Sequence, residues 1–272
     1  MQVKRSGKAK GIHYQQWTSE QPGQPVLVLI MGYSGSIASW TEDFLDDLHK
    51  TFDLVLLDNR GTGYSFHPEQ IEDITIAAMA DDVHEVVQEL GLQRFHVLGY
   101  SLGGCIAQQY AAVYPEQVQS LILLSTTAGG SLYAAPDKDF LSNLESPKGT
   151  TPWEMALHMW GLCLSEARVE KHKEALGVIH ERQMQKPTPR RTFAGQMKAF
   201  RSFAAEKLFP DGCPLPVTII SGTNDRLMPH RNSLLLQQYY PNSRLIEIED
   251  CEHLPYLEER DALIQAIQSI LA

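Results

Sequence analysis

The sequence lacks the features of disulfide-rich, membrane-spanning and nucleic-acid-binding proteins. Its four cysteines are scattered and none forms a C-x-x-C pair, so a disulfide framework is not indicated. The longest apolar run, Val26–Met31, is far shorter than the roughly 20 residues of a membrane-spanning helix. With 23 Lys and Arg against 33 Asp and Glu, the net charge of −10 has the wrong sign for attraction to phosphate backbones or anionic lipid. We therefore expect neither nucleic acid nor a membrane as a partner.

Short motifs for several ligand classes are also missing. The N-terminal residues do not resemble the apolar core of a secretory signal, and with the unpaired cysteines this predicts a reduced, cytoplasmic setting. No G-x-x-x-x-G-K-[ST] and no strand-linked G-x-G-x-x-G is present, and the histidines show no H-E-x-x-H spacing. We therefore expect no nucleotide cofactor and no metal ion.

What the sequence does contain is an alternation of short apolar runs with longer segments of helical period. The expected strands are 26–31, 52–58, 95–100, 120–126, 216–222 and 243–250. The expected helices are 36–50, 74–91, 102–114, 231–239 and 255–271. Such alternation predicts βαβ units and hence an α/β fold with a mostly parallel, doubly wound sheet. Residues 4–17 are expected to add a hairpin at the edge of that sheet.

The alternation is interrupted between residues 130 and 212. This stretch has no convincing strand and is rich in Trp, Met and Phe. Because the strands resume after it, we predict one core domain made of residues 1–129 and 213–272, with residues 130–212 inserted as a helical cap. A cap has little core of its own, so Trp153, Met159 and Trp160 are candidates for the lining of an apolar substrate pocket.

The predicted cap also differs from the rest of the chain in charge. It carries 12 Lys and Arg against 10 Asp and Glu, whereas the remainder carries 11 against 23. Four of these cations, Arg190, Arg191, Lys198 and Arg201, have spacings that share one helix face. The cluster suits an anionic substrate or an acidic acyl carrier protein, and the alternative of a solvated helix face is the commoner meaning of such a pattern.

The most informative string is G-Y-S-L-G at residues 99–103. It follows an apolar run and precedes a segment of helical period, the context in which G-x-S-x-G forms a strained strand-to-helix turn that exposes the serine hydroxyl. Small residues two before and two after the serine are needed because side chains there would collide. Ser101 is therefore the candidate nucleophile.

A serine hydroxyl needs a base, and the base needs an orienting acid. His253 follows the last expected strand and is the candidate base; Asp225 follows the strand before it and is the candidate acid. Asp250 and Glu252 are rivals for the acid, but they adjoin the histidine and would have difficulty reaching behind its ring. The order nucleophile, acid, histidine matches one class of serine hydrolases, the α/β-hydrolases.

On these strings the chain resembles the α/β-hydrolase superfamily, in its branch of capped serine esterases, lactonases and C–C hydrolases. The strings SGTNDRLMP and EHLPYLEE resemble the acid and histidine loops of that family, and DNRGTGYS at 58–65 resembles its turn after a core strand. The resemblance implies the α/β-hydrolase fold with an inserted cap. For Asp58 and Arg60 it implies a buried ion pair and a turn scaffold instead of catalysis.

The resemblance also implies an oxyanion hole made of two backbone N–H groups, those of Leu102 and Tyr33. The family usually has His before the glycine of the second loop, whereas this chain has Met31. A backbone donor survives that change, but the side-chain hydrogen bonds that brace the loop do not. Ser34 and Ser36 are expected to cap the next helix, with replacement bracing as the alternative.

The function expected from these residues is cleavage of a carboxylic ester or thioester of a small to medium apolar acyl substrate through an acyl-enzyme. Two further possibilities stay open. The same triad serves hydrolysis of an enol-lactone or of a C–C bond in a vinylogous diketone. A non-catalytic relative would instead bind a ligand in the same pocket, although such relatives usually lose a triad member.

Overall fold

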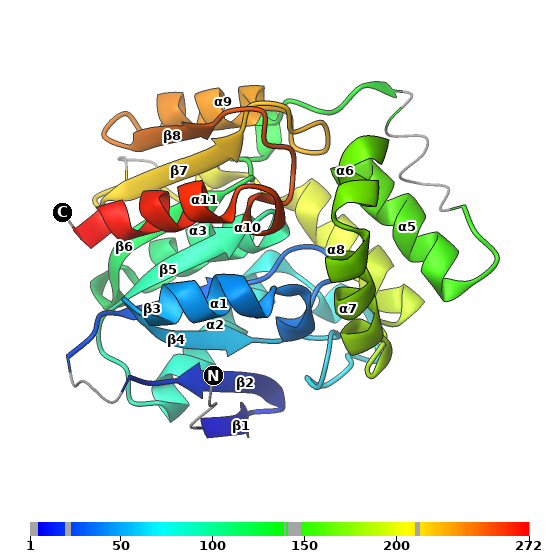
Figure 1. The fold of residues 1–272 in the computed structure, drawn as a ribbon. Helices are drawn as coiled ribbons and strands as arrows, with labels where there is room; N and C mark the ends of the chain where they lie inside the picture. Colours follow the sequence, from blue (N-terminus) through cyan, green and yellow to red (C-terminus); the bar gives the residue numbers. More distant parts are fainter. Residues whose placement is uncertain (1–4, 20–22, 139, 141–147, 210–212, 272) are drawn as a thin grey trace.

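The centre of the molecule is a single sheet, which runs from β1 at the bottom to β8 at the top of Figure 1. The structure is a computed structural model and describes residues 5–19, 23–138, 140, 148–209 and 213–271. The strands are β1 (Arg5–Ala9), β2 (Ile12–Trp17), β3 (Val26–Ile30), β4 (Asp53–Leu57), β5 (Phe95–Tyr100), β6 (Val118–Leu124), β7 (Val217–Gly222) and β8 (Arg244–Ile248). They lie in the order β1-β2-β4-β3-β5-β6-β7-β8. Strand β2 pairs antiparallel with both β1 and β4, and every other pair of neighbouring strands in this order is parallel. This mostly parallel sheet confirms the predicted fold class.

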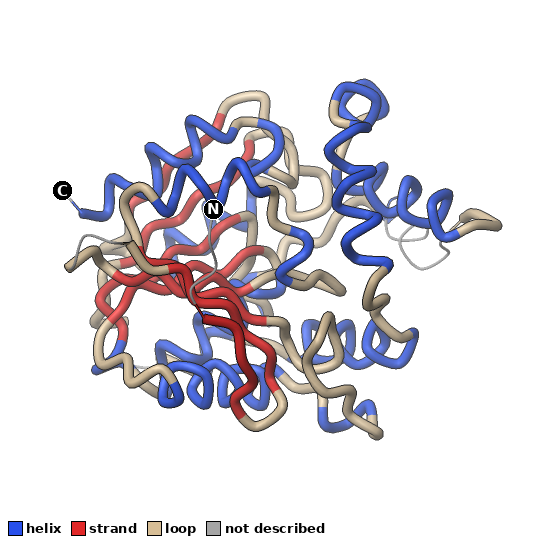
Figure 2. The backbone as a smooth tube through the Cα atoms, turned by 60° about the horizontal axis from the view of Figure 1, so that its bottom comes forward, coloured by secondary structure: helices blue, strands red, loops and turns tan. Residues whose placement is uncertain are grey.

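Helices cover both faces of the sheet (Figure 2). The helices of the core are α1 (Glu42–His49), α2 (Ile76–Glu89), α3 (Leu102–Val113), α9 (Arg231–Tyr239), α10 (Pro255–Glu258) and α11 (Arg260–Gln268). Buried side chains of α2, α3 and α9 form one core cluster with the sheet, and those of α1, α10 and α11 form a second cluster on the opposite face. The sheet is therefore doubly wound, as the alternation of apolar runs predicts.

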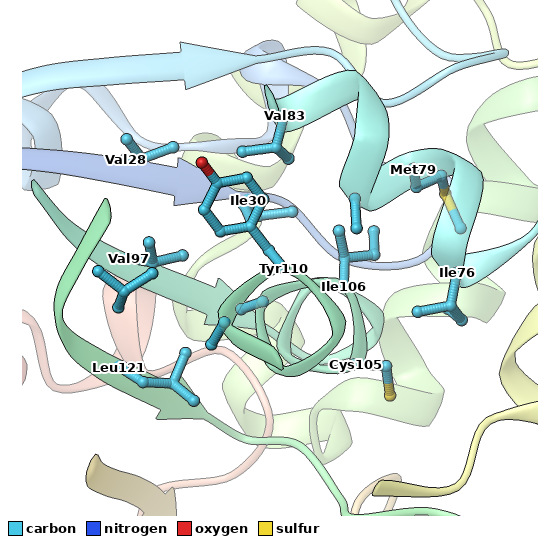
Figure 3. Packing of buried hydrophobic residues seen from close by; sticks show 14 of the residues in the cluster. Val28, Ile30, Ile76, Met79, Val83, Val97, Cys105, Ile106, Tyr110 and Leu121 are labelled. Atoms are coloured by element: carbon cyan, nitrogen blue, oxygen red, sulfur yellow. The ribbon is translucent and has the colours of Figure 1, made fainter. Parts of the chain in front are cut away.

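The strands read as unbroken apolar runs because both of their faces are buried. On β3, Val28 and Ile30 point into the first cluster, while Leu27 and Leu29 point into the second. Figure 3 shows the first cluster, in which Val28, Ile30 and Val97 of the strands meet side chains of α2 and α3. A helix bundle would show its apolar residues at a spacing of three to four; a strand buried on two faces shows none of that periodicity.

Helix α3 lies so close to β3 that there is no room for a side chain at Gly103 in its first turn. A Cβ atom on Gly103 would lie 2.2 Å from the backbone oxygen of Ile30, and one on Gly99 would lie 2.3 Å from the backbone oxygen of Gly103. Both distances are to backbone atoms, which a rotamer change does not move. The packing of α3 on the sheet therefore explains why small residues are required at positions 99 and 103, two before and two after Ser101.

We expect Gly103→Ala to destabilise the fold by about 3 kcal/mol or more, because α3 must shift away from β3 to admit the methyl group. Gly161→Ala is the matched control: Gly161 lies in a helix and a Cβ there meets nothing within 4 Å. That change should stabilise by about 0.5 to 1 kcal/mol. Urea unfolding of both variants gives the comparison, and an unchanged midpoint for Gly103→Ala would contradict the packing argument.

Two predicted helices are broken in the structure. The segment 36–50 is a short 3₁₀ turn, Ile37–Ser39, followed by α1, and Ser36 caps the 3₁₀ turn through a capping box with Ser39. The segment 255–271 divides into α10 and α11 because Glu259 has φ −135° and ψ 52°, outside the helical region. Both predictions of one continuous helix were wrong. The spacing of apolar residues does not reveal a break of one or two residues, because the same spacing resumes after it.

Between β6 and β7 the described residues form the helices α5 (Pro152–Cys163), α6 (Glu166–Lys171), α7 (Lys173–Met184) and α8 (Arg190–Ser202). Figure 1 shows them gathered beyond the carboxyl ends of the parallel strands. The division into a core of residues 1–129 and 213–272 and a cap of residues 130–212 stays a prediction, and residues 139, 141–147 and 210–212 of it lie outside the described part.

Helix α5 begins in a capping box whose strength should depend on pH. The Glu154 carboxylate accepts hydrogen bonds from the Thr150 hydroxyl and from the backbone N–H groups of Thr150 and Thr151, and these bonds lower the pKa of Glu154 to about 2. Because the folded pKa lies below the unfolded one, the contribution of Glu154 to stability is present above pH 4.5 and is lost as pH falls toward 2.

We therefore expect Glu154→Ala to lower the thermal unfolding midpoint at pH 6, and the deficit to shrink at pH 3.5. Glu174→Ala is the control, because Glu174 occupies the first turn of α7, where the N-cap side chain makes no capping bond. Its effect should change much less between the two pH values. If Glu154→Ala lowered the unfolding midpoint equally at pH 6 and at pH 3.5, the result would contradict the lowered pKa of Glu154.

Candidate active site

Ser101 sits at the turn between β5 and α3 in a strained conformation. Its φ of 53° and ψ of −121° lie in a region that non-glycine residues rarely adopt. The turn is held by the Ser101 N–H, which donates to Leu124 O at 2.9 Å, and by the Thr126 hydroxyl, which donates to Ser101 O at 2.6 Å. Such strain persists only where the surroundings fix it, and it is frequent at functional sites.

His253 and Asp225 converge on Ser101 from the ends of neighbouring strands. His253 lies on the loop after β8 and Asp225 on the loop after β7. His253 Nε2 is 3.3 Å from Ser101 Oγ, and His253 Nδ1 is 2.7 Å from Asp225 Oδ2. The exposed fractions of the three residues are 7%, 4% and 2% for Ser101, Asp225 and His253. The structure thus brings together the three residues that the sequence nominated.

The partners of the imidazole indicate which of its two nitrogens carries the proton. An ionised carboxylate only accepts hydrogen bonds, so Nδ1 carries the proton and donates to Asp225. In the neutral ring Nε2 is then left as the acceptor, facing the hydroxyl of Ser101. This tautomer is the one in which the ring is able to take a proton from the serine.

The acid and the histidine are each fixed by neighbours that do not face Ser101. Asp225 Oδ1 accepts the backbone N–H groups of Leu227 at 3.0 Å and Met228 at 2.7 Å, which leaves Oδ2 for the imidazole. The Tyr100 hydroxyl donates to His253 O at 3.0 Å, and the Tyr100 ring packs against the imidazole. Burial raises the pKa of Tyr100 well above its ordinary value, so this hydroxyl stays a donor.

The histidine loop has a second anchor, Glu258, which is the last residue of α10. Its carboxylate accepts the backbone N–H groups of Glu252 at 3.0 Å and Leu254 at 2.8 Å, on either side of His253. Arg168 of α6 lies 2.9 Å from the same carboxylate. Burial raises the pKa of Glu258, while the two N–H groups and the guanidinium oppose the shift.

The rival acids are engaged elsewhere. Asp250 Oδ1 accepts from the side chain of Asn224, and the Glu252 carboxylate accepts the backbone N–H of Ser165. Neither contact involves the imidazole, which supports the choice of Asp225 over both.

The loop after β3 lies directly against Ser101. A Cβ atom on Gly32 would be 3.0 Å from Ser101 Cβ and 3.1 Å from Tyr100 O. Leu102 is the first residue of α3, so its N–H has no partner inside the helix. Met31 is buried, and its backbone oxygen accepts from the Asn59 side chain at 2.9 Å. The loop is thus braced without a histidine; the assignment of Tyr33 and Leu102 as oxyanion donors stays a prediction.

The predicted ion pair between Asp58 and Arg60 was wrong. Asp58 accepts from His13 Nδ1 at 2.8 Å and from the backbone N–H of Ile37 at 2.7 Å. Arg60 forms a bidentate pair with Asp82 of α2, at 2.6 and 2.8 Å. The two side chains leave the turn toward different elements, so each finds its own partner. Both contacts tie the 58–65 turn to the core, as expected for a scaffold.

The three residues nominated for a substrate pocket lie on α5. The rings of Trp153 and Trp160 contact each other and the ring of His180 on α7. Met159 is half-buried on the same helix. These contacts explain the aromatic content of α5 by helix packing, and a role in binding substrate stays a prediction. The four cations of the basic cluster are exposed on α8, where Lys198 pairs with Glu72.

Two kinds of feature are absent from the described residues. Within that part of the chain no group of three His, Cys, Asp or Glu residues is arranged to hold a metal ion. No helix there combines the length and apolarity needed to cross a membrane.

Comparison with known proteins identifies the fold family of this chain. A family model described as the alpha/beta hydrolase fold matches residues 25–157 and 164–260. A curated relative from Agrobacterium fabrum, named "Putative carbamate hydrolase RutD", is 28% identical over an alignment of 248 residues, which covers 87% of this chain and 89% of that protein.

Two solved structures illustrate the likeness of the fold. The esterase RhEst1 from Rhodococcus sp. ECU1013 has a TM-score of 0.83 at 23% identity, covering 100% of this chain and 98% of that one. The enol-lactonase from Burkholderia xenovorans LB400 has a TM-score of 0.83 at 21% identity, covering 98% and 99%. Together with the family match, they show that this chain belongs to the α/β-hydrolase fold family.

Proposed function

We propose that this protein is a serine hydrolase that cleaves a carboxylic ester or thioester of a small to medium apolar acyl substrate. The observation that carries the proposal is the buried chain from Ser101 Oγ through the His253 ring to the Asp225 carboxylate. The 3.3 Å between Oγ and Nε2 is long for a hydrogen bond, but such contacts tighten when substrate binds.

In the proposed mechanism Ser101 Oγ attacks the substrate carbonyl while His253 Nε2 takes its proton. The N–H groups of Leu102 and Tyr33 stabilise the oxyanion. His253 then protonates the leaving alcohol or thiol, which gives the acyl-enzyme, and a water activated by His253 releases the acid and restores Ser101. Asp225 stays ionised and stabilises the imidazolium in both steps.

A carbamate is a second candidate substrate, favoured by the name of the relative from Agrobacterium fabrum. Its carbonyl would be attacked in the same way, giving a carbamoyl-enzyme. The triad is also compatible with hydrolysis of an enol-lactone or of a C–C bond, and the fold with a non-catalytic role in ligand binding. A thioester on an acidic carrier protein remains a hypothesis for the exposed cations of α8.

A substrate panel distinguishes these reactions. It contains short-chain p-nitrophenyl esters, a p-nitrophenyl carbamate, an enol-lactone, a vinylogous diketone and an acyl carrier thioester, each assayed under first-order conditions. We expect the highest kcat/KM for an ester or thioester. In a separate experiment at saturating p-nitrophenyl ester, we expect a burst of p-nitrophenol from formation of the acyl-enzyme. Preference for the carbamate, lactone or diketone would replace the ester assignment, and absence of turnover together with tight ligand binding would favour the non-catalytic role.

A further inference from the structure

The loop between β3 and the first 3₁₀ turn is held from the side by α8 and the residues before it. Gln196 Oε1 accepts the backbone N–H of Ser34 at 2.7 Å, and the Thr188 hydroxyl donates to Ser34 O at 2.9 Å. Ser34 has a φ of 57°, a left-handed conformation that a non-glycine residue adopts at a cost. Both polar groups of one strained residue are thus fixed from outside the loop.

These contacts bear on the peptide group that carries the Tyr33 N–H. The Ser34 N–H belongs to the peptide between residues 33 and 34, which Gln196 holds. Met31 O belongs to the peptide between residues 31 and 32, which Asn59 holds. The peptide that carries the Tyr33 N–H lies between these two anchored groups. Its own oxygen, Gly32 O, accepts the Gly35 N–H at 3.3 Å within the loop, and the two anchors add restraints on its direction from outside the loop.

Gln196 is an unfavourable residue for its position if packing is its only role. It is completely buried, and its Nε2 has no hydrogen-bond partner among the residues that the structure describes. A buried donor without a partner costs stability, and an apolar side chain of similar shape avoids that cost. The amide of Gln196 makes one hydrogen bond, in which its oxygen accepts the Ser34 N–H, and this contact is what an apolar side chain would lack.

Helix α8 packs tightly against its neighbours, so its side chains are able to hold the loop in a fixed position. A Cβ atom on Gly61 would lie 2.5 Å from Thr192 Oγ1, and one on Gly195 would lie 2.6 Å from Ile74 Cδ1. Thr192, one turn before Gln196 on the same buried face, donates to Gly61 O at 3.1 Å. The Tyr33 hydroxyl also reaches this helix, donating to Phe193 O at 3.2 Å.

We propose that Gln196 is a positioning residue for the reaction: its side-chain oxygen holds the Ser34 N–H and thereby aims the Tyr33 N–H at the oxyanion. The inference rests on the proposed function. It makes transition-state stabilisation depend on the contact that Gln196 makes with Ser34 from α8, a helix that contributes no member of the triad. Loss of the contact should therefore reduce kcat and leave ground-state binding of the ester largely intact.

The test compares Gln196→Met, which keeps the length but removes the acceptor, with Thr192→Val. The second change keeps the branched side chain that packs against Gly61 and removes only a buried hydrogen bond of the same helix, which does not involve Ser34. For Gln196→Met we expect kcat for a p-nitrophenyl ester to fall about 10- to 100-fold with KM within about threefold. The inhibition constant of an acyl trifluoromethyl ketone, which forms a tetrahedral adduct, should rise by a similar factor. Thr192→Val should change each value by less than about threefold.

Two further variants keep the test decisive. Gln196→Glu retains an oxygen opposite the Ser34 N–H and should restore kcat to within about fivefold of the unchanged protein. Thr188→Val removes the contact to Ser34 O at a half-buried position, and should lower kcat alone, by a smaller factor, even if Gln196→Met does not fold. Thermal unfolding of every variant separates positioning from loss of structure.

The inference is overturned if Gln196→Met behaves like Thr192→Val, if its loss falls on KM, or if Gln196→Glu is as impaired as Gln196→Met. Failure of the proposed function looks different, because Ser101→Ala would then retain turnover whatever happens at Gln196. An inactive Ser101→Ala protein combined with an unimpaired Gln196→Met protein overturns only the positioning role.

Discussion

Ser101→Ala should lower kcat for ester hydrolysis by at least about 10⁴-fold and abolish covalent labelling by a fluorophosphonate. The reason is that Ser101 Oγ is the atom that faces His253 Nε2, and an alanine offers no nucleophile there. The fold should be unaffected, because the turn is held through the backbone groups of Ser101 and not through its hydroxyl. The rate of p-nitrophenyl ester hydrolysis gives kcat, and intact-protein mass spectrometry after treatment with the fluorophosphonate shows whether the protein is labelled.

A second serine paired with a histidine supplies the control. Ser221 on β7 is buried, its Oγ lies 3.1 Å from His230 Nδ1, and His230 Nε2 lies 2.7 Å from Glu247. Ser221 belongs to a strand interior and has no strand-to-helix turn behind it. Ser221→Ala should therefore keep labelling and turnover within about twofold of the unchanged protein. Labelling that persists in Ser101→Ala and disappears in Ser221→Ala would reject the nucleophile assignment.

Asp225→Asn should be nearly as damaging, with a loss of about 10⁴-fold in kcat. The two backbone N–H groups that bind Oδ1 of Asp225 require an acceptor, so they fix the orientation of the replacing amide. Its NH₂ group then faces His253 Nδ1, and that nitrogen has to become the acceptor. The ring proton moves to Nε2, where it prevents the imidazole from accepting the proton of Ser101.

Asp250→Asn is the matched control for this change. Asp250 is the rival acid on the same side of the sheet, and its carboxylate contacts Asn224 instead of the imidazole. We expect its kcat to stay within about threefold. The rates of acylation, measured by single-turnover kinetics, should separate the two variants. A large loss in Asp250→Asn with an active Asp225→Asn would transfer the role of the acid to Asp250.

The parts of the fold that the sequence predicts well are those with a local cause. Parallel strands are buried on two faces and become short apolar runs, so β3, β5 and β7 were found within a residue or two of their bounds. The glycines around Ser101 are required by a collision of neighbouring residues. The breaks at Trp40 and Thr41 and at Glu259 were missed because one or two residues leaving the helical region hardly alter apolar spacing.

Within the site, the residues at strand ends were predictable and those that hold them were not. Ser101, Asp225 and His253 each follow an apolar run, and the order of the strands brings such positions to one edge. Gln196 and Ser34 are 162 positions apart, and nothing near either one signals the contact. The partner of Arg60 was missed for the same reason: a charge on a turn is compatible with any opposite charge that the packing brings near it.

The distances along the chain between Ser101 and its partners also bear on when activity first appears as the protein is made. The serine and the histidine are separated by 152 positions, and the histidine follows β8, which lies at the end of the strand order beside β7. Contacts of such separation carry a large loop-closure entropy and form late. A chain still emerging from the ribosome would contain its nucleophile well before its base, since 152 positions separate the two, and it would be inert in that interval. Reactivity is thereby delayed until β8 and the loop after it have been made.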